Sequence, residues 1–314
     1  MAKMGCHPEG ECRRVVLAVV FLSNLAMLND RSFTCRYGRL ETVSPLIRRI
    51  VAENPGPFTF MGTGTYVVGH GDVAVIDPGP LLASHIEALQ AALAGERITH
   101  ILITHTHIDH SPAAAPLKAA TGAPTLGFGP HGHRGETGEA GADLAFMPDI
   151  LLRDGDAVAG KGWRLEAIHT PGHASNHLCF ALPQERALFS GDQVMGWSTT
   201  VIAPPDGDMA AYMRSLAALG RRQDETYWPT HGGPIRRPRK HLAELIAHRF
   251  ARREAILAAL SAGGPLTPKE LVARVYASLD PRLVPAAAES VRAHLIELAA
   301  SRLVRDEQGS WRKL

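Results

Sequence analysis

The sequence predicts an α/β fold for residues 45–238 and a winged-helix-like module for residues 239–314. Up to about residue 238, apolar runs typical of strands alternate with amphipathic runs typical of helices, which is the pattern of an α/β domain. After that point, three helical runs precede two short strands, the order of a winged helix. A chain of 314 residues with 45% hydrophobic and 20% charged residues can bury a sizeable core.

The first elements of the α/β part follow one another from residue 58. Runs 58–69 and 73–80 are expected to be strands separated by the turn-forming letters HGD, and run 81–95 is expected to be a helix. The continuous apolar run 98–104, ITHILIT, predicts a buried strand. Run 112–122 has proline near its start and glycine at its end, so we expect a helix there.

The later elements continue this alternation. A strand at 125–128 leads into the Gly-rich stretch 129–143, which is expected to be a surface loop. Further strands are expected at residues 150–158, 163–170, 177–183, 186–192 and within 225–233, and a helix at 209–222. In the C-terminal module, helices are expected near residues 241–260, 269–277 and 286–300, and a hairpin within 302–314.

The C-terminal module carries a surplus of positive charge. Residues 236–314 hold 15 Lys/Arg against 8 Asp/Glu, although the whole chain has a formal net charge of +2. Such a surplus suits an anionic partner. A solvated, Arg-rich helical surface explains it equally well.

Residues 1–44 are expected to be a poorly ordered N-terminal extension, outside the domains or upstream of the natural start. The apolar stretch 15–28 has the length found in secretory signals and is too short to span a bilayer, and no small-residue cleavage site follows it. Cys6, His7 and Cys12 remain a minor zinc alternative, and four cysteines without a CxxC pair indicate no disulfide framework. We therefore expect a cytoplasmic protein without a stable membrane partner, with export left open.

Titratable side chains gather where the strand 98–104 ends, in the letters HTHIDH. Polar groups packed this densely cost free energy unless something binds them. Further histidines and an aspartate come just after later strands, which brings the nitrogen and oxygen ligands to seven: His105, His107, Asp109, His110, His173, Asp192 and His231. This number suits two first-row metal ions that share one bridging carboxylate. Asp77 is expected to orient a ligand, with an Asx-turn as the alternative.

The motifs HTHIDH, TPGH, SGD and PTHG occur in the order typical of the metallo-β-lactamase superfamily, which the chain resembles over roughly residues 55–235. The resemblance implies an αββα sandwich, with two mixed sheets between helices. It also implies that one metal ion is bound by His105, His107 and His173, the other by Asp109, His110 and His231, and that Asp192 bridges them. Zn²⁺ is the favoured ion for such ligands, and Mn²⁺ or Fe²⁺ would fit similar ones.

A hydrolysis reaction that uses a metal-bound hydroxide is the expected chemistry. Asp109 and His177 are the predicted catalytic residues; His177 could line the pocket or donate a proton to a leaving group, and a structural histidine is the alternative. His131 and His133 form another HxH pair in the Gly-rich stretch. We expect them to be mobile loop residues able to touch substrate.

Three features bear on the substrate. His107 stands where the flavin-dependent diiron branch of the superfamily has Glu, and only 38 residues separate Asp192 from His231, too few for the inserted domain of β-CASP nucleases. The segment 191–216 together with the C-terminal module resembles the lactamase-beta-2-like metallohydrolases, which include a mitochondrial single-strand endoribonuclease. That resemblance covers nearly all of residues 45–314, with Gly64 where the family has Asn, which puts any pocket role of this position in doubt.

Three functions therefore stay open. A metal-dependent phosphodiesterase that cleaves single-stranded RNA is favoured if the basic tail and the metal site face one groove. A small-molecule thioesterase or lactonase of the glyoxalase II kind is favoured if the tail caps a narrow apolar pocket. A non-enzymatic regulator that binds nucleic acid through its winged helix is disfavoured by seven intact ligands. The sequence indicates no oligomeric state.

Overall fold

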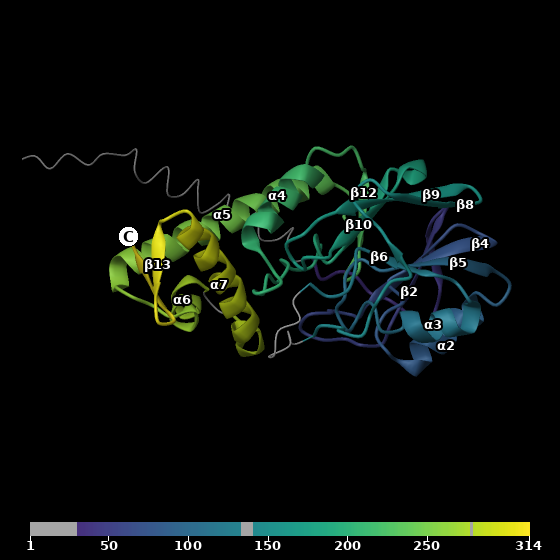
Figure 1. Ribbon diagram of the computed structural model, residues 1–314, viewed down its shortest axis with the longest axis horizontal. Coiled ribbons are helices and arrows are strands. Elements are labelled where there is room, and N and C mark those ends of the chain that lie inside the picture. The colour runs from purple at the N-terminus through teal and green to yellow at the C-terminus, as the bar shows by residue number, and fades with distance from the viewer. Residues whose placement is uncertain (1–29, 133–140, 277–278) are drawn as a thin grey trace, which may run out of the picture.

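A computed structural model describes residues 30–132, 141–276 and 279–314, and within them two mixed sheets pack face to face (Figure 1). The first sheet runs in the order β1 (Glu41–Ser44), β2 (Ile47–Val51), β3 (Gly64–Val68), β4 (Asp72–Ile76), β5 (Arg97–Leu102), β6 (Thr125–Gly127) and β7 (Ile150–Leu151). The second runs in the order β12 (Thr226–Pro229), β11 (Ala187–Gly191), β10 (Leu178–Leu182), β9 (Trp163–His169) and β8 (Ala157–Gly160). Apolar side chains from both sheets, among them Tyr66, Leu102, Phe180 and Phe189, fill the space between them.

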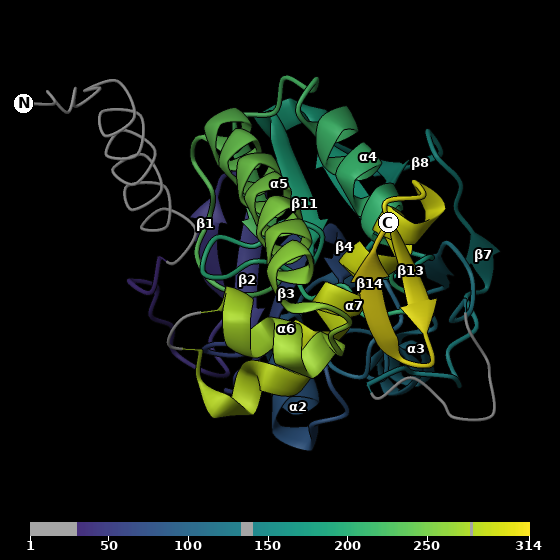
Figure 2. The ribbon, with the colours of Figure 1, turned by 90° about the vertical axis from the view of Figure 1, so that its left-hand side faces the viewer.

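Helices cover the outer face of each sheet. On the first sheet, α2 (Ala83–Ala92) and α3 (Ala114–Thr121) bury Leu89 and Leu117 against strand residues such as Val75. On the second, α4 (Met209–Leu219) and the start of α5 (Pro238–Gly263) lie side by side (Figure 2). This arrangement confirms the predicted αββα sandwich.

The C-terminal module consists of the end of α5, α6 (Pro268–Val275), α7 (Val284–Ala300) and the hairpin of β13 (Val304–Glu307) and β14 (Ser310–Lys313). Its own core includes Ile256, Leu271, Leu295 and Trp311. Helix α5 serves both parts, because its first turns contribute Leu242 to the layer over the second sheet. The predicted order of helices and hairpin is confirmed.

The structure differs from the sequence expectations in three places. Of the run 58–69, only Gly64–Val68 form a strand. β1 and β2 were not predicted, because β2 reads IRRIV and two arginines interrupt its apolar pattern; β1 lies inside the segment 1–44 that was expected to be an extension. The run 150–158 divides between two sheets, with Gly155 at φ 85° between its halves β7 and β8.

The N-terminal stretch 15–28 and the alternative zinc residues Cys6, His7 and Cys12 lie outside the described residues. Among the residues that are described, no helix combines the length and the apolar character needed to cross a membrane. In that same part of the chain, Cys35 and Cys179 are free thiols.

Candidate metal centre

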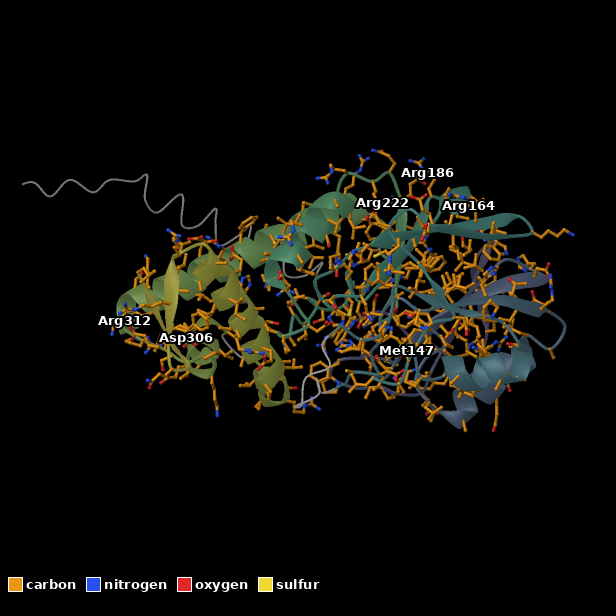
Figure 3. The ribbon with its side chains drawn as sticks, in the orientation of Figure 1. Met147, Arg164, Arg186, Arg222, Asp306 and Arg312 are labelled. Atoms are coloured by element: carbon orange, nitrogen blue, oxygen red, sulfur yellow. The ribbon has the colours of Figure 1, made fainter. Side chains whose placement is uncertain are left out.

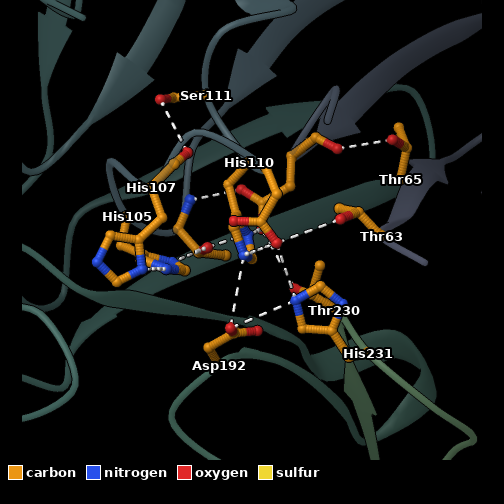
Figure 4. Close-up of polar contacts among 12 residues, drawn as sticks. Thr63, Thr65, His105, His107, His110, Ser111, Asp192, Thr230 and His231 are labelled. Atoms are coloured by element: carbon orange, nitrogen blue, oxygen red, sulfur yellow. Dashed lines mark hydrogen bonds and ion pairs between the residues drawn. The ribbon is translucent and has the colours of Figure 1, made fainter. Parts of the chain in front are cut away.

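The loops that follow four strands bring the seven predicted ligands together. Figure 4 labels His105, His107, His110, Asp192 and His231. The residues of HTHIDH follow β5, and His173, Asp192 and His231 follow β9, β11 and β12. Because β11 and β12 are parallel, Asp192 and His231 leave the second sheet at the same edge. Ligand atoms lie within 4.8 Å of one another in three overlapping groups: His105, His107 and His173; His105, His110 and Asp192; and Asp109, His110 and His231.

One end of this cluster consists of three imidazoles. The Nε2 atoms of His105 and His173 lie 2.9 and 3.1 Å from Nδ1 of His107. A single nitrogen carries at most one hydrogen, so Nδ1 of His107 could satisfy only one of these two neighbours through a hydrogen bond. Three nitrogens that converge in this way fit a cation, which accepts lone pairs from all of them.

The other end combines histidines with carboxylates. Oδ2 of Asp109 lies 3.2 Å from Nε2 of His231 and 3.5 Å from Nε2 of His110. Oδ2 of Asp192 lies 3.4 Å from Nε2 of His231 and 3.8 Å from Nε2 of His173, so it sits between the two ends. Among the described residues, Nε2 of His110 and Oδ1 of Asp192 are buried without a hydrogen-bond partner. The donor set therefore fits two divalent ions with Asp192 between them.

Hydrogen bonds behind the cluster hold the histidine rings. Nδ1 of His110 donates to Oδ2 of Asp77 at 2.9 Å, and Nδ1 of His173 donates to the carbonyl of Val201 at 2.7 Å. Nδ1 of His231 lies 3.2 Å from the carbonyl of Gly62. An acceptor at Nδ1 keeps the hydrogen on that atom and leaves the Nε2 lone pair toward the cluster, which is how outer partners orient metal-binding histidines.

The two ends of the cluster differ in charge. Burial and the surrounding imidazoles of His110, His107 and His173 hold the pKa of His105 well below its ordinary value, so its ring is neutral. Burial also opposes charge on His110, but the carboxylates of Asp109, Asp192 and Asp77 raise its pKa well above the ordinary value. Neutral nitrogens thus gather at one end and negative oxygens at the other.

For His177 the structure favours the structural alternative, and for His131 it differs from the expectation. His177 is completely buried; its Nε2 accepts a hydrogen bond from the backbone N–H of Asp192 at 3.2 Å, and its Nδ1 lies 2.9 Å from Oγ1 of Thr170. Both nitrogens are therefore engaged by other groups of the protein, as expected for a structural histidine. His131 is only 2% exposed, with Nδ1 3.0 Å from Oγ1 of Thr106, so it is not a mobile loop residue; His133 lies outside the described residues.

Sequence reasoning missed several residues that support the cluster. Thr104 donates its backbone N–H to Oδ1 of Asp77 at 2.8 Å and its hydroxyl to Oδ2 at 2.7 Å. Arg49 is buried and donates to the carbonyls of Thr230 and Gly232, on either side of His231. Thr104 adjoins the first predicted ligand and could have been noticed there, whereas nothing in the letters around Arg49 indicates its contact.

Close packing against α4 explains why a glycine stands before the histidine of TPGH. Gly172 has φ 148°, and a Cβ atom there would lie 2.4 Å from the Cα of Tyr212 in α4. We expect Gly172→Ala to lower the free energy of unfolding by about 3 kcal/mol, because overpacking and backbone strain add. Urea unfolding would measure this, with Gly95→Ala as the control, since a Cβ at Gly95 meets no atom within 4 Å. Equal stability of both variants would contradict the explanation.

Comparison with known proteins gives a consistent result. A family model described as "Metallo-beta-lactamase superfamily" matches residues 59–231, and one described as "Beta-lactamase associated winged helix domain" matches residues 267–311. Lactamase-like protein adaB of Aspergillus niger is 32% identical over 86% of this chain and 85% of its own length. An atrochrysone carboxyl ACP thioesterase of Aspergillus chevalieri is 32% identical over 85% of both chains.

Solved structures agree on the fold. A metallo-beta-lactamase family protein of Thermus thermophilus is 25% identical, with a TM-score of 0.73, over 87% of this chain and all of that chain. A beta-lactamase domain protein of Burkholderia ambifaria is 21% identical, with a TM-score of 0.75, over 90% of this chain and 96% of that chain. The likeness to both extends beyond the sandwich into the C-terminal helices.

Proposed function

This chain belongs to the metallo-β-lactamase superfamily and is a hydrolase of that superfamily, and from this premise we propose that it hydrolyses an acyl thioester. We propose that two divalent ions, with Zn²⁺ the favoured ion, bind at the seven residues predicted from the sequence. His105, His107 and His173 would hold one ion, and Asp109, His110 and His231 the other, with Asp192 shared. Ions held in this way lower the pKa of a bound water and polarise the carbonyl that is attacked.

The observation that carries the proposal is the likeness to a thioesterase along almost the whole chain. The matched thioesterase of Aspergillus chevalieri is aligned over 85% of both chains, more than the sandwich alone could supply. The shared part therefore reaches into the C-terminal module. A common arrangement of sandwich and module supports a related substrate class, because α5 and α7 hydrogen-bond the loop 195–204, which contacts His173 and Asp192.

The surface beside the predicted ligands suits an apolar acyl group. The segment 141–147 lies against the ligand loop, since the N–H of Asp143 donates to the carbonyl of Thr106 at 2.8 Å. Ile108, Leu144 and Met147 of these two segments are 55%, 43% and 62% exposed. Exposed apolar side chains next to a polar site are typical of a surface that contacts an apolar ligand.

Asp109 is the predicted catalytic residue that best suits contact with a substrate. Its side chain is 23% exposed, against 11% for Asp192 and 1% for His231. Thr63 donates its hydroxyl to Oδ2 of Asp109 at 3.3 Å and so helps to hold the carboxylate in place. For His177 we replace the predicted proton transfer by a positioning role, because its Nε2 holds the backbone N–H of Asp192.

The arrangement gives less support to single-stranded RNA as the substrate. A basic groove of about 620 Å³ is lined by Arg186, Gln223, Asp224, Glu225, Thr226, Arg236, Arg237, Pro238, Arg239 and Lys240. These residues lie near the first residues of β11 and β12, whereas Asp192 and His231 come after the last residues of these two strands. At ~3.3 Å per residue, the groove lies roughly 15 Å from the cluster, at the other end of these strands. In Figure 3, Arg186 of this groove and the nearby Arg222 lie far from Met147, which belongs to the segment 141–147 beside the ligand loop.

The positive surplus of the C-terminal part is also partly engaged within the chain. Several arginines donate to carbonyls or carboxylates of the protein itself: Arg239, Arg249, Arg252, Arg253, Arg282, Arg292, Arg305 and Arg312. Arginines bonded in this way are less available to phosphates. The division into a catalytic domain, residues 45–238, and a module, residues 239–314, remains part of the proposal.

The proposal is tested by offering both substrates to one preparation. Zinc- and manganese-loaded protein is incubated with a benzoyl thioester of N-acetylcysteamine, with release of thiol followed by absorbance, and with single-stranded RNA followed on a gel. We expect thioester hydrolysis that disappears in the Asp192→Ala variant, which controls for contaminating enzymes. RNA cleavage that disappears in that variant, together with an inert thioester, would replace the thioesterase proposal by the nuclease.

A further inference from the structure

The loop of residues 195–204, which follows Asp192, is tied to the C-terminal helices. In the described part of the chain, four side chains of α5 and α7 hydrogen-bond backbone groups of this loop. Three donate to carbonyls, His241 to Met195 at 2.9 Å, Arg249 to Thr200 and Arg292 to Pro204, while Oγ of Ser290 accepts from the N–H of Ile202 at 3.2 Å. The loop is therefore held from one side along most of its length.

From its other side, the same loop supports two predicted metal ligands. The carbonyl of Val201 accepts from Nδ1 of His173 at 2.7 Å. The hydroxyl of Thr200 donates to the backbone carbonyl of Asp192, also at 2.7 Å. Residues 200–202 thus connect α5 and α7 to two predicted ligands, His173 and Asp192.

Arg249 is an unusual residue for a helix interface. It is 3% exposed, and its guanidinium carbon lies 5.1 Å from the centre of the Tyr212 ring. Among the described residues, no carboxylate forms an ion pair with Arg249, although a buried guanidinium without one is costly. An apolar side chain would fill the same space without that cost, so the bond to the carbonyl of Thr200 is the feature that distinguishes arginine here.

We propose that Arg249 and Ser290 are positioning residues through which the C-terminal helices set the geometry of the metal centre. Arg249 fixes the carbonyl of Thr200, and Ser290 fixes the N–H of Ile202, so the two consecutive peptide groups 200–201 and 201–202 are both held. The carbonyl of Val201 lies between these two points and can keep the ring of His173 in place. The inference rests on the metal site of the proposed function.

The test measures metal binding rather than activity alone. Zinc affinity of the full-length protein is determined by competition with a chromophoric chelator, and the absorption spectrum of the Co²⁺-loaded protein reports ligand geometry. The variants are Arg249→Met and the milder Ser290→Ala. The matched control is Arg253→Met, which removes an arginine of the same helix whose Nε lies 3.3 Å from Oε2 of Glu297 in α7, so that it bonds to the neighbouring helix and not to the loop. Melting temperatures are recorded for all of them.

We expect Arg249→Met and Ser290→Ala to weaken zinc binding about tenfold and to shift the Co²⁺ spectrum, because loss of outer partners typically costs 10–100-fold in affinity. Arg253→Met should bind zinc as the unmodified protein does. If Arg249→Met does not fold, Ser290→Ala decides. Zinc binding unchanged in Ser290→Ala and in Arg249→Met, or weakened equally in Arg253→Met, would overturn the inference.

A different result would point to the metal site itself. Asp192→Ala is measured in the same series, because Asp192 is a predicted ligand and not an outer partner. If Asp192→Ala binds zinc as tightly as the unmodified protein, the metal site of the proposed function is wrong and the inference falls with it. If Asp192→Ala loses zinc while Arg249→Met and Ser290→Ala keep it, only the inference fails.

Discussion

Replacing Asp192 with alanine is expected to remove the bound metal and, with it, nearly all hydrolysis. Oδ2 of Asp192 lies 3.4 Å from Nε2 of His231 at one end of the cluster and 3.8 Å from Nε2 of His173 at the other, so both ends depend on this carboxylate. Loss of an outer partner of a metal ligand typically costs 10–100-fold in affinity. Loss of a shared ligand should exceed that, and we expect a decrease of more than about 100-fold in zinc affinity.

Metal content after dialysis and turnover of a thioester would be measured together for Asp192→Ala and for the isosteric Asp192→Asn. Asp224→Ala is the matched control, because Asp224 pairs with Arg222 at the other end of the same sheet and is not a predicted ligand. Full metal content and full turnover in the Asp192 variants would show that this residue is not a ligand. Loss of both in Asp224→Ala as well would point to a general loss of structure.

The sequence carries enough information to bring together the seven predicted ligands but not the residues behind them. The letters HTHIDH, TPGH, SGD and PTHG place each ligand just after a strand, and strand ends meet at one edge of the sandwich. Arg49 contacts the carbonyl of Thr230, which lies 181 positions later in the chain. Arg49 belongs to β2, whose two arginines make the strand look too charged to be buried. Such a contact exists only once both sheets are folded.

Side-chain direction limits what spacing can predict. His177 is four residues after His173, and that spacing does not say that its ring turns into the protein beneath Asp192. His131 lies in a Gly-rich stretch, whose composition predicts a mobile loop. The carbonyl of the preceding Pro130 accepts a hydrogen bond from Asn176 at 3.1 Å, and Oγ1 of Thr106 contacts Nδ1 of His131. These tertiary contacts override what the composition predicts.

Charge composition was equally ambiguous for the C-terminal module. The count of 15 basic residues in 236–314 is compatible with a nucleic-acid surface and with internal bonding. The positions of Arg249 and Arg292, which donate to carbonyls of the loop 195–204, favour internal bonding for these two. A residue count cannot separate the alternatives, because it does not say which charges face other parts of the chain.

Replacing Asp77 with asparagine is expected to weaken metal binding by about 10–100-fold while leaving the fold intact. Asp77 has φ 48°, a conformation that asparagine tolerates, so the backbone should not change. Its oxygens accept from Nδ1 of His110 and from both the N–H and the hydroxyl of Thr104. An amide nitrogen in place of one oxygen would face a donor. If it faces His110, the hydrogen of that ring moves to Nε2, where the lone pair is needed for metal.

Zinc affinity and melting temperature of Asp77→Asn would be compared with those of Asp72→Asn. Asp72 begins the strand β4 that ends just before Asp77, and it pairs with the exposed Arg97. The control therefore makes the same chemical change at the other end of one strand. Equal zinc affinity in the two variants would mean that His110 binds metal without help from Asp77. A selective loss in Asp77→Asn, with both melting temperatures near that of the unmodified protein, would make the orientation of His110 a requirement for the metal centre.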